Sequence, residues 1–273
     1  MNELETIFCK VFGCNRSSLY LDTKKPLGSK EERSLEKIFK GRLRGEPIQY
    51  LLGEAEFMGL PLRVKPGVLI PRPETEILVD EAIKRISLST RMNCADKFIS
   101  ILDIGTGSGN IPIALAASKD IHAEKIYSVD ISDACLSLAK SNARLNHVSD
   151  KITFLKSDVF GIFNKSDKRF DFIISNPPYV AVSEYLCLPD DVKQEPSSAL
   201  LAGEDGLYFY REIEKGSRLY LKEGGQIFLE IGAMQKKGIE EIFSDKMLWM
   251  DLNFIKDLNG IDRIAIIKKV RSS

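Results

Sequence analysis

The sequence predicts an α/β protein built on a doubly wound, mostly parallel sheet of seven strands. From about residue 98 onward, short apolar runs alternate with amphipathic helical segments, which is the pattern of βαβ units. The runs are continuous in Ile, Leu, Val and Phe, as expected for parallel strands covered on both faces. Asn259-Gly260 joins the last two runs and predicts a hairpin, so the sheet should end in an antiparallel strand.

The N-terminal region has a different, helical pattern. Within 31–44, one stripe of an amphipathic helix is formed by Leu35, Ile38, Phe39 and Leu43, and Gly45-Glu46-Pro47 ends the helix. Residues 48–71 instead contain three glycines and three prolines between short apolar runs. This punctuation predicts a β-hairpin or irregular linker.

The remaining elements follow in regular order, and they define three parts of the chain. We expect a small N-terminal helical domain at 1–46, a β-hairpin linker at 47–72 and an α/β domain at 73–273. Helices are expected at 3–12, 31–44, 74–88, 110–118, 132–145, 205–221 and 233–243. Strands are expected at 98–104, 125–129, 152–155, 170–175, 226–231, 252–257 and 261–268.

Composition limits the classes of function. The 39 basic and 39 acidic side chains give zero net charge, which disfavours stable, sequence-independent binding of nucleic acid. The N-terminus lacks a signal-peptide pattern, and no segment has the roughly 20 apolar residues that span a bilayer. The cysteines are scattered and far from both histidines, so we expect free thiols, no metal site and a cytoplasmic protein. These residues are Cys9, Cys14, Cys94, Cys135, Cys187, His122 and His147.

A glycine-rich turn directly follows the first predicted strand of the α/β domain. It reads Gly105-Thr106-Gly107-Ser108-Gly109, and a helix is expected to follow. Glycine lets the backbone turn sharply and approach a ligand, and the unpaired N–H groups of the helix favour an anionic group such as a carboxylate. A nicotinamide or flavin site shares this turn, but the spacing is G-x-G-x-G and Asn110 replaces the third glycine of the dinucleotide pattern.

Acidic residues after the next strands complete a predicted nucleoside site. Asp130 follows the second strand, where its carboxylate can accept hydrogen bonds from both ribose hydroxyls of NAD or of S-adenosylmethionine (SAM). Asp158 follows the third strand and is expected to accept from an adenine amino group, with Val159 lining the adenine slot. Asp103 is expected either to orient the glycine turn or to meet the ammonium group of the ligand.

The tetrapeptide Asn176-Pro177-Pro178-Tyr179 lies at the carboxyl end of a buried strand, where open α/β sheets bind ligands. The side-chain oxygen of Asn176 and the carbonyl of Pro177 can each accept an N–H of a planar nitrogen, which turns its lone pair outward. The two prolines stiffen this wall, and Tyr179 offers a flat face for stacking. With the glycine turn and Asp130, this pattern predicts SAM-dependent methylation of a planar nitrogen.

The chain resembles the PrmC/HemK family of glutamine-N5 methyltransferases, which have a class I SAM-dependent Rossmann-like domain. The tetrapeptide is shared with N6-adenine DNA methyltransferases, but other segments are typical of PrmC/HemK. These segments are Gly45-Glu46-Pro47-Ile48-Gln49-Tyr50, Glu56-Phe57, Leu69-Ile70-Pro71-Arg72-Pro73-Glu74-Thr75-Glu76, Glu195-Pro196 through Ala199-Leu200, and Leu229-Glu230-Ile231-Gly232. The match runs from about residue 45 to the C-terminus.

The resemblance implies a substrate and several site residues. The substrate would be the glutamine of the Gly-Gly-Gln motif of class I peptide chain release factors, with the N-terminal helical unit helping to dock them. Family members usually carry about one more helix before 3–12. The cofactor contacts would be Gly105, Thr106, Gly107, Ser108, Gly109, Asp130, Asp158, Val159, Asn176 and Phe57. The substrate contacts would be Asn176, Pro177, Pro178, Tyr179 and Arg72, and the segment from Arg72 to Thr75 would border the site. Arg72 could instead form a salt bridge that shapes its loop.

Two other enzymes share part of this pattern. A methyltransferase acting on a flipped nucleic-acid base would need a basic face and a target-recognition segment. Zero net charge and the absence of a long insertion after Tyr179 disfavour it. Methylation of a ribosomal-protein glutamine is disfavoured by Pro71-Arg72-Pro73-Glu74-Thr75. A SAM-bound scaffold without activity would not need Asn176 and Tyr179.

Overall fold

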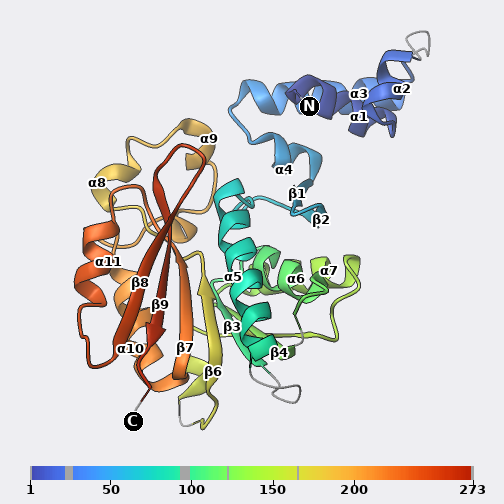
Figure 1. Ribbon diagram of the computed structural model, residues 1–273. Helices are drawn as coiled ribbons and strands as arrows, with labels where there is room; N and C mark the ends of the chain where they lie inside the picture. Colours follow the sequence, from blue (N-terminus) through green and yellow to red (C-terminus); the bar gives the residue numbers. More distant parts are fainter. Residues whose placement is uncertain (1, 22–26, 93–98, 122, 165, 272–273) are drawn as a thin grey trace.

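The computed structural model describes residues 2–21, 27–92, 99–121, 123–164 and 166–271 (Figure 1). Cys94, His122 and the expected first residue of the strand at 98 lie outside the described residues. Among the residues described, every helix is too short or too polar to cross a membrane.

Helices α1 (Glu3–Phe12), α2 (Arg16–Leu21), α3 (Ser29–Leu43) and α4 (Ile48–Leu52) form a small unit that projects from one end of the molecule (Figure 1). A capping box between Asn2 and Glu5 begins α1, and Gly13 ends it in the left-handed conformation. Ile7, Leu35 and Ile38 form the core of this unit. Leu35 and Ile38 of the stripe predicted for 31–44 therefore face this core, whereas Phe39 and Leu43 are 37% and 88% exposed.

The segment predicted as a hairpin linker is partly helical. Residues 48–52 form α4, a helix that the predicted β-hairpin or irregular linker did not include. Ile48, Leu51 and Leu52 pack against the core of the helical unit at helical spacing, and this tertiary contact outweighs the surrounding turn signals. The hairpin is shorter than predicted and consists of β1 (Glu54–Phe57) and β2 (Leu60–Arg63), which pair antiparallel.

The α/β domain contains the predicted seven-stranded sheet. Its strand order is β5-β4-β3-β6-β7-β9-β8, and β9 runs antiparallel to both of its neighbours. The strands are β3 (Ile99–Ile104), β4 (Ala123–Asp130), β5 (Ile152–Lys156), β6 (Phe170–Ser175), β7 (Leu221–Glu230), β8 (Trp249–Lys256) and β9 (Asp262–Lys269). The hairpin at Asn259-Gly260 is confirmed, and it places the last strand inside the sheet, next to β7.

Helices cover both faces of the sheet, as the continuous apolar strands predicted. Successive side chains of a strand point to opposite faces, so Ile101 packs under α5 (Pro73–Met92), α6 (Asn110–Ala117) and α7 (Asp133–Leu145). Leu102 packs against α10 (Tyr208–Tyr220) and α11 (Lys236–Ile242) on the other face. Two separate apolar cores result, and together they fix the strand ends that carry the site.

Several boundaries differ from the predictions. The helix expected at 205–221 begins at Tyr208, because Gly206 adopts a left-handed conformation (φ +72°) just before it. The strand expected at 226–231 begins five residues earlier, at Leu221. The short helices α8 (Val182–Tyr185) and α9 (Asp190–Lys193) were not predicted, and they follow the tetrapeptide.

Candidate active site

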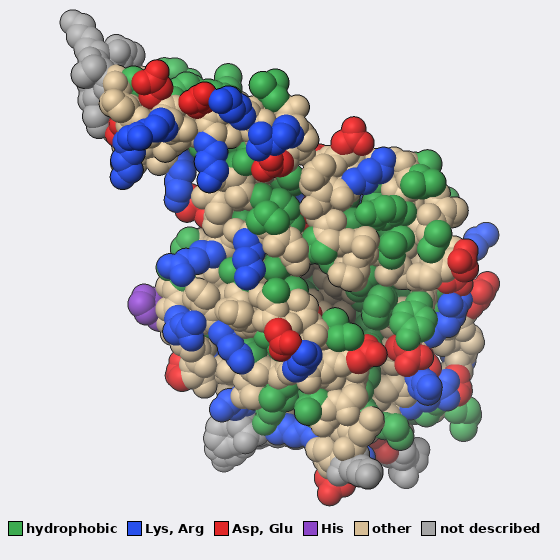
Figure 2. Space-filling model, turned by 180° about the vertical axis from the view of Figure 1, so that it is seen from behind, with side chains coloured by type: hydrophobic (Ala, Val, Ile, Leu, Met, Phe, Trp, Pro, Cys, Tyr) green, Lys and Arg blue, Asp and Glu red, His purple; other side chains and the backbone are tan. Residues whose placement is uncertain are grey.

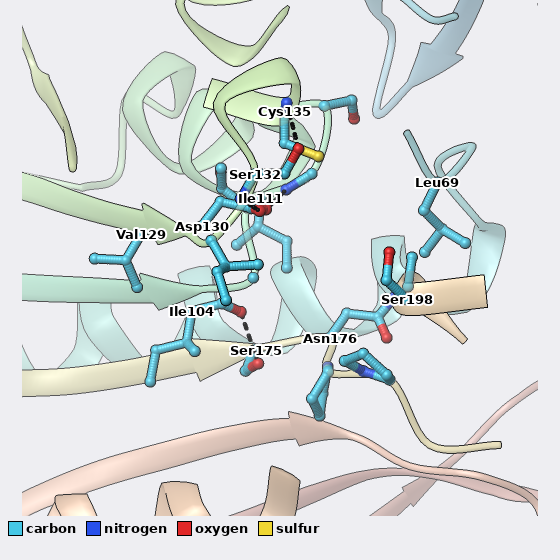
Figure 3. Close-up of a pocket in the computed structure, with 18 of the residues that line it drawn as sticks. Leu69, Ile104, Ile111, Val129, Asp130, Ser132, Cys135, Ser175, Asn176 and Ser198 are labelled. Atoms are coloured by element: carbon cyan, nitrogen blue, oxygen red, sulfur yellow. Dashed lines mark hydrogen bonds between the residues drawn. The ribbon is translucent and has the colours of Figure 1, made fainter. Parts of the chain in front are cut away.

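A pocket lies at the carboxyl ends of the parallel strands, where the strand order reverses between β3 and β6. Its walls come from the turns after β3, β4 and β5, the tetrapeptide after β6, and two outer segments around residues 69–72 and 196–199. A hollow bordered by hydrophobic side chains is visible on the face shown in Figure 2. Figure 3 shows Asp130 and Asn176 reaching the pocket from different strands.

The glycine turn has the backbone that only glycine adopts readily. Gly105, Gly107 and Gly109 have φ of +76°, +56° and +85°. At Gly109 a Cβ would lie only 3.0 Å from the Cβ of Ala139 on α7. Gly105 to Ser108 line the pocket, whereas Gly109 lies outside the lining and its missing side chain permits close packing of α6 and α7.

Asp130 is at the pocket edge and organises the turns on both sides of it. Its Oδ2 accepts the backbone N–H of Gly107 at 2.9 Å, and its Oδ1 accepts the N–H of Ser132 at 2.9 Å. Partial burial raises the pKa of Asp130, while these two hydrogen bonds lower it. The carboxylate oxygens keep further lone pairs for a ligand in the pocket. Cys135, which sequence reasoning did not select, lines the pocket beside Asp130.

Two buried polar residues belong to this region: Asp103, which precedes the turn, and Ser108, which is part of it. The Asp103 side chain is fully buried, accepts a hydrogen bond from Ser128 at 2.7 Å, and does not line the pocket. Burial raises the pKa of Asp103 to about 7. This position favours the predicted orienting role over direct contact with an ammonium group. Ser108 lines the pocket, and its hydroxyl has no hydrogen-bond partner within the described part of the chain.

Asp158 and Val159 line the pocket together, as expected for the adenine side of a nucleoside site. The turn that holds them is tight, since Val159 has φ of +45°. The hydroxyl of Ser157 accepts the N–H of Ile162 at 3.0 Å and so closes the turn. Both residues therefore line the same pocket as Asp130, and their contact with adenine stays a prediction.

The tetrapeptide forms the wall opposite Asp130. Asn176, Pro177 and Pro178 line the pocket, and Asn176 donates from Nδ2 to the hydroxyl of Thr75 at 3.0 Å. The Asn176 side-chain oxygen is thereby left as an acceptor. Tyr179 is not part of the lining, and its hydroxyl lies 3.4 Å from Glu230.

Two residues behind the tetrapeptide were not selected from the sequence. Thr75, in the first turn of α5, donates to Glu230 at 2.6 Å, and both side chains are buried. Burial raises the pKa of Glu230 to about 7. The segment of Glu230 was noted only as a mark of the family resemblance, and the segment from Arg72 to Thr75 was expected to border the site without a role for the Thr75 side chain. A carboxylate directly after the apolar run Ile227 to Leu229 is the signal that could have identified Glu230.

Arg72 and Phe57 differ in how they relate to the pocket. Arg72 lines it and forms a salt bridge with the buried Glu195, which also accepts the N–H of Ile70 at 2.9 Å. This is the loop-shaping salt bridge considered as the alternative role of Arg72. Phe57 is buried in the core beneath α5 and is absent from the pocket lining. The pocket geometry thus gives no support for a contact between Phe57 and a cofactor.

Two family models match the chain. A PrmC N-terminal domain matches residues 1–53, and a methyltransferase domain matches residues 95–251. A release factor glutamine methyltransferase of Thermodesulfovibrio yellowstonii is 38% identical over 100% of this chain and 94% of its own length. One of Fusobacterium nucleatum is 37% identical over 98% of this chain and 73% of its own length. This chain belongs to the release factor glutamine methyltransferase family.

Solved structures confirm the fold of this family member. The catalytic domain of hMettl16 has a TM-score of 0.59 at 16% identity, covering 89% of this chain and 82% of that one. A ribosomal protein L11 methylase from Lactobacillus delbrueckii has a TM-score of 0.51 at 20% identity, covering 77% and 86%. At these identities the likeness shows the Rossmann-like methyltransferase fold alone.

The family assignment makes the chain a SAM-dependent methyltransferase, and the pocket fits that cofactor. The glycine turn leaves room for a ligand against its backbone, Asp130 presents a carboxylate at the end of β4, and Ser108 offers an unpartnered buried hydroxyl. Within the described residues, no group of His, Cys, Asp and Glu side chains is arranged to hold a metal ion.

Proposed function

We propose that this enzyme transfers the methyl group of SAM to the side-chain amide nitrogen of the glutamine in the Gly-Gly-Gln motif of class I release factors. The observation that carries this proposal is the position of Asn176. Its carboxamide stands in the pocket wall across from Asp130, with Nδ2 engaged by Thr75 and the oxygen left to accept a substrate N–H.

The cofactor side of the pocket would be formed by the turns after β3, β4 and β5. SAM supplies an electrophilic methyl group on a sulfonium sulfur. We assign the turn from Gly105 to Ser108, with the start of α6, to the methionine part, because its N–H groups suit a carboxylate. Asp130 would accept from the ribose hydroxyls, and Asp158 with Val159 would enclose the adenine.

The substrate side would be formed by the tetrapeptide. An amide nitrogen is a weak nucleophile because its lone pair is delocalised into the carbonyl group. Asn176 would accept one N–H through its side-chain oxygen, and the carbonyl of Pro177 would accept the other. This directs the face of the nitrogen toward the methyl group, and both acceptors stabilise the positive charge that grows as the N–C bond forms. The proton then leaves the nitrogen for solvent, so no strong base is required.

Tyr179 would act from behind this wall. Its hydroxyl meets Glu230, and its backbone carbonyl accepts from the side chain of Gln235 at 2.7 Å. Two contacts on the same residue hold the end of the tetrapeptide against β7 and α11. We therefore assign Tyr179 to positioning of the tetrapeptide, and any stacking on the substrate would require its ring to reach the pocket.

We place the docked release factor against helices α1 to α4. Helix α3 carries exposed basic side chains at helical spacing on one stripe, and Figure 2 shows Lys and Arg gathered on this unit. The stripe consists of Lys30, Arg33, Lys37 and Lys40, and Arg44 continues it directly after the helix. Within the described residues, Lys30, Arg33 and Lys37 form no ion pair, so their charge is available to an acidic partner surface.

The test is to incubate the enzyme with labelled SAM and a purified class I release factor. A factor whose Gly-Gly-Gln glutamine is changed to alanine serves as the matched control. We expect label in the unaltered factor only, and one added methyl group on its Gly-Gly-Gln peptide by mass spectrometry. Equal labelling of the altered factor would refute the assigned acceptor. Labelling of a ribosomal protein or of nucleic acid in place of the factor would refute the substrate class.

A further inference from the structure

A chain of three side chains connects the pocket wall to a buried carboxylate. Asn176 donates to Thr75 at 3.0 Å, and Thr75 donates to Oε2 of Glu230 at 2.6 Å. Thr75 and Glu230 are 0% and 1% exposed, and Glu230 lies outside the pocket lining. Of the three, only Asn176 and Thr75 face the pocket, so Glu230 acts on the substrate only through its neighbours.

The direction of these hydrogen bonds follows from the donors available. A carboxylate only accepts, so the single proton of the Thr75 hydroxyl must point at Glu230. Only lone pairs of that hydroxyl then remain for Asn176. The carboxamide must therefore turn its NH₂ group to Thr75, and its oxygen points elsewhere.

We propose that Glu230 and Thr75 are positioning residues that fix which end of the Asn176 carboxamide faces the substrate. With Glu230 ionised, Asn176 presents its oxygen to the substrate amide N–H. The opposite orientation would set the NH₂ group of Asn176 against the NH₂ group of the substrate, and two donors cannot pair. This assignment rests on the proposed transfer to a glutamine amide.

A second set of contacts ties the same carboxylate to the far end of the tetrapeptide. The hydroxyl of Tyr179 lies 3.4 Å from Oε1 of Glu230, and the backbone carbonyl of Tyr179 accepts from Gln235. Gln235 in turn accepts the N–H of Gly232 at 2.9 Å, just after β7. Glu230 is thus linked to both ends of the tetrapeptide, to Asn176 through Thr75 and to Tyr179 directly.

Protonation of Glu230 would reverse the direction of the hydrogen bonds from Asn176 through Thr75 to Glu230. A protonated carboxyl can donate to Thr75, which frees the Thr75 proton to point at Asn176 and favours the flipped carboxamide. The groups that act on Glu230 are Glu74, Arg263, Thr75 and Tyr179. Burial and Glu74 raise its pKa, Thr75, Arg263 and Tyr179 lower it, and the result is about 7. Transfer should therefore weaken as the pH falls through about 7.

The decisive variants separate the hydroxyl of Thr75 from its bulk. Thr75→Val keeps the shape and removes the hydroxyl, and we expect kcat to fall about 10- to 30-fold, the effect of one hydrogen bond in the transition state. Thr75→Ser keeps the hydroxyl and should restore kcat to within roughly threefold of wild type. SAM affinity should be unchanged in both. Equal rates for Thr75→Val and Thr75→Ser would overturn the proposal.

Glu230→Gln tests the carboxylate, and Glu214→Gln is its control. Glu214 on α10 is also buried and hydrogen-bonded, but its partners are Trp249 and Arg218, and it lies outside the pocket lining. We expect Glu230→Gln to lower kcat and to remove the loss of activity below pH 7, and Glu214→Gln to keep the wild-type pH profile. If Glu230→Gln does not fold, the Thr75 pair decides. An unchanged pH profile in folded Glu230→Gln would count against the proposal.

A measurement without turnover separates this inference from the proposed function. The side-chain amide resonances of Asn176 can be assigned by ¹⁵N NMR through their absence in Asn176→Ala. They should shift as the pH passes through about 7 in wild type and remain fixed in Glu230→Gln. If release factor is not labelled but these shifts occur, the proposed substrate fails while the positioning role stands. Resonances that do not respond to pH in wild type would refute the role of Glu230.

Discussion

Replacement of Asn176 by alanine should abolish most methyl transfer and leave the cofactor site intact. Within the described residues, the Asn176 carboxamide makes one hydrogen bond, from Nδ2 to Thr75. Its oxygen is free to accept from the substrate, and the alanine variant lacks this acceptor. The cofactor turns are held by Asp130 and by backbone hydrogen bonds that do not involve Asn176 side-chain atoms. The variant therefore tests the acceptor and little else.

The size of the effect follows from the charge that the acceptor faces. A hydrogen bond to a group with developing charge contributes about 1.5–3 kcal/mol. Because the positive charge on the nitrogen appears only as the methyl group is transferred, most of this difference falls on the rate. We expect about 2.7 kcal/mol, which corresponds to a loss of about a hundredfold in the single-turnover rate.

The assay is a single-turnover reaction with enzyme in excess over release factor, combined with calorimetric titration of SAM. Asn253→Ala is a suitable control, since Asn253 is an exposed asparagine on β8, away from the pocket. We expect the control to match wild type and Asn176→Ala to retain SAM affinity. A single-turnover rate within about threefold of wild type would refute the acceptor role.

Three further outcomes are expected. Asn142→Ala removes buried hydrogen bonds to the backbone of Arg63 and Ser108 and should lower the free energy of unfolding by about 2–4 kcal/mol in urea titrations; a loss below about 0.5 kcal/mol would contradict this. Because the pKa of Glu230 is raised to about 7 in the folded state, the folded protein binds the extra proton between about pH 4.5 and 7. Its contribution to stability should thus fall as the pH rises through that window, and thermal unfolding of Glu230→Gln should show a flatter pH dependence than wild type. Glu195→Ala breaks the contacts that hold one outer wall and should weaken SAM binding about tenfold by calorimetry; unchanged affinity would show that this wall is held by other contacts.

The parts of the site that the sequence predicted are contiguous in the chain. The glycine turn, the aspartate at the end of β4 and the tetrapeptide after β6 each follow a predicted strand, so their places at the carboxyl end of a strand could be inferred locally. Parallel strands then bring these ends to one edge of the sheet. The parallel topology alone was therefore enough to predict that Gly105, Asp130 and Asn176 lie at one site.

The partners that hold those residues could not be inferred in the same way. Thr75 lies 101 residues from Asn176 and 155 from Glu230, and Glu195 lies 125 residues from Ile70. Pairs at such separations leave no periodicity in the sequence, because each residue is set by the environment that the other elements create. The same reason explains α4, whose helical state depends on a core formed by α1 and α3.

The hydrogen-bonding role of the tetrapeptide depends on residues that are distant from it in the chain. An Asn-Pro-Pro-Tyr sequence alone offers acceptors in a stiff segment, but a free carboxamide can present either its oxygen or its NH₂ group. The orientation is decided by the proton that Thr75 directs at Glu230, on elements remote in the chain. The end of the Asn176 carboxamide that faces the substrate would thus depend on α5 and β7 as much as on the tetrapeptide. A Thr75→Val variant with the tetrapeptide intact and reduced transfer would show this dependence directly.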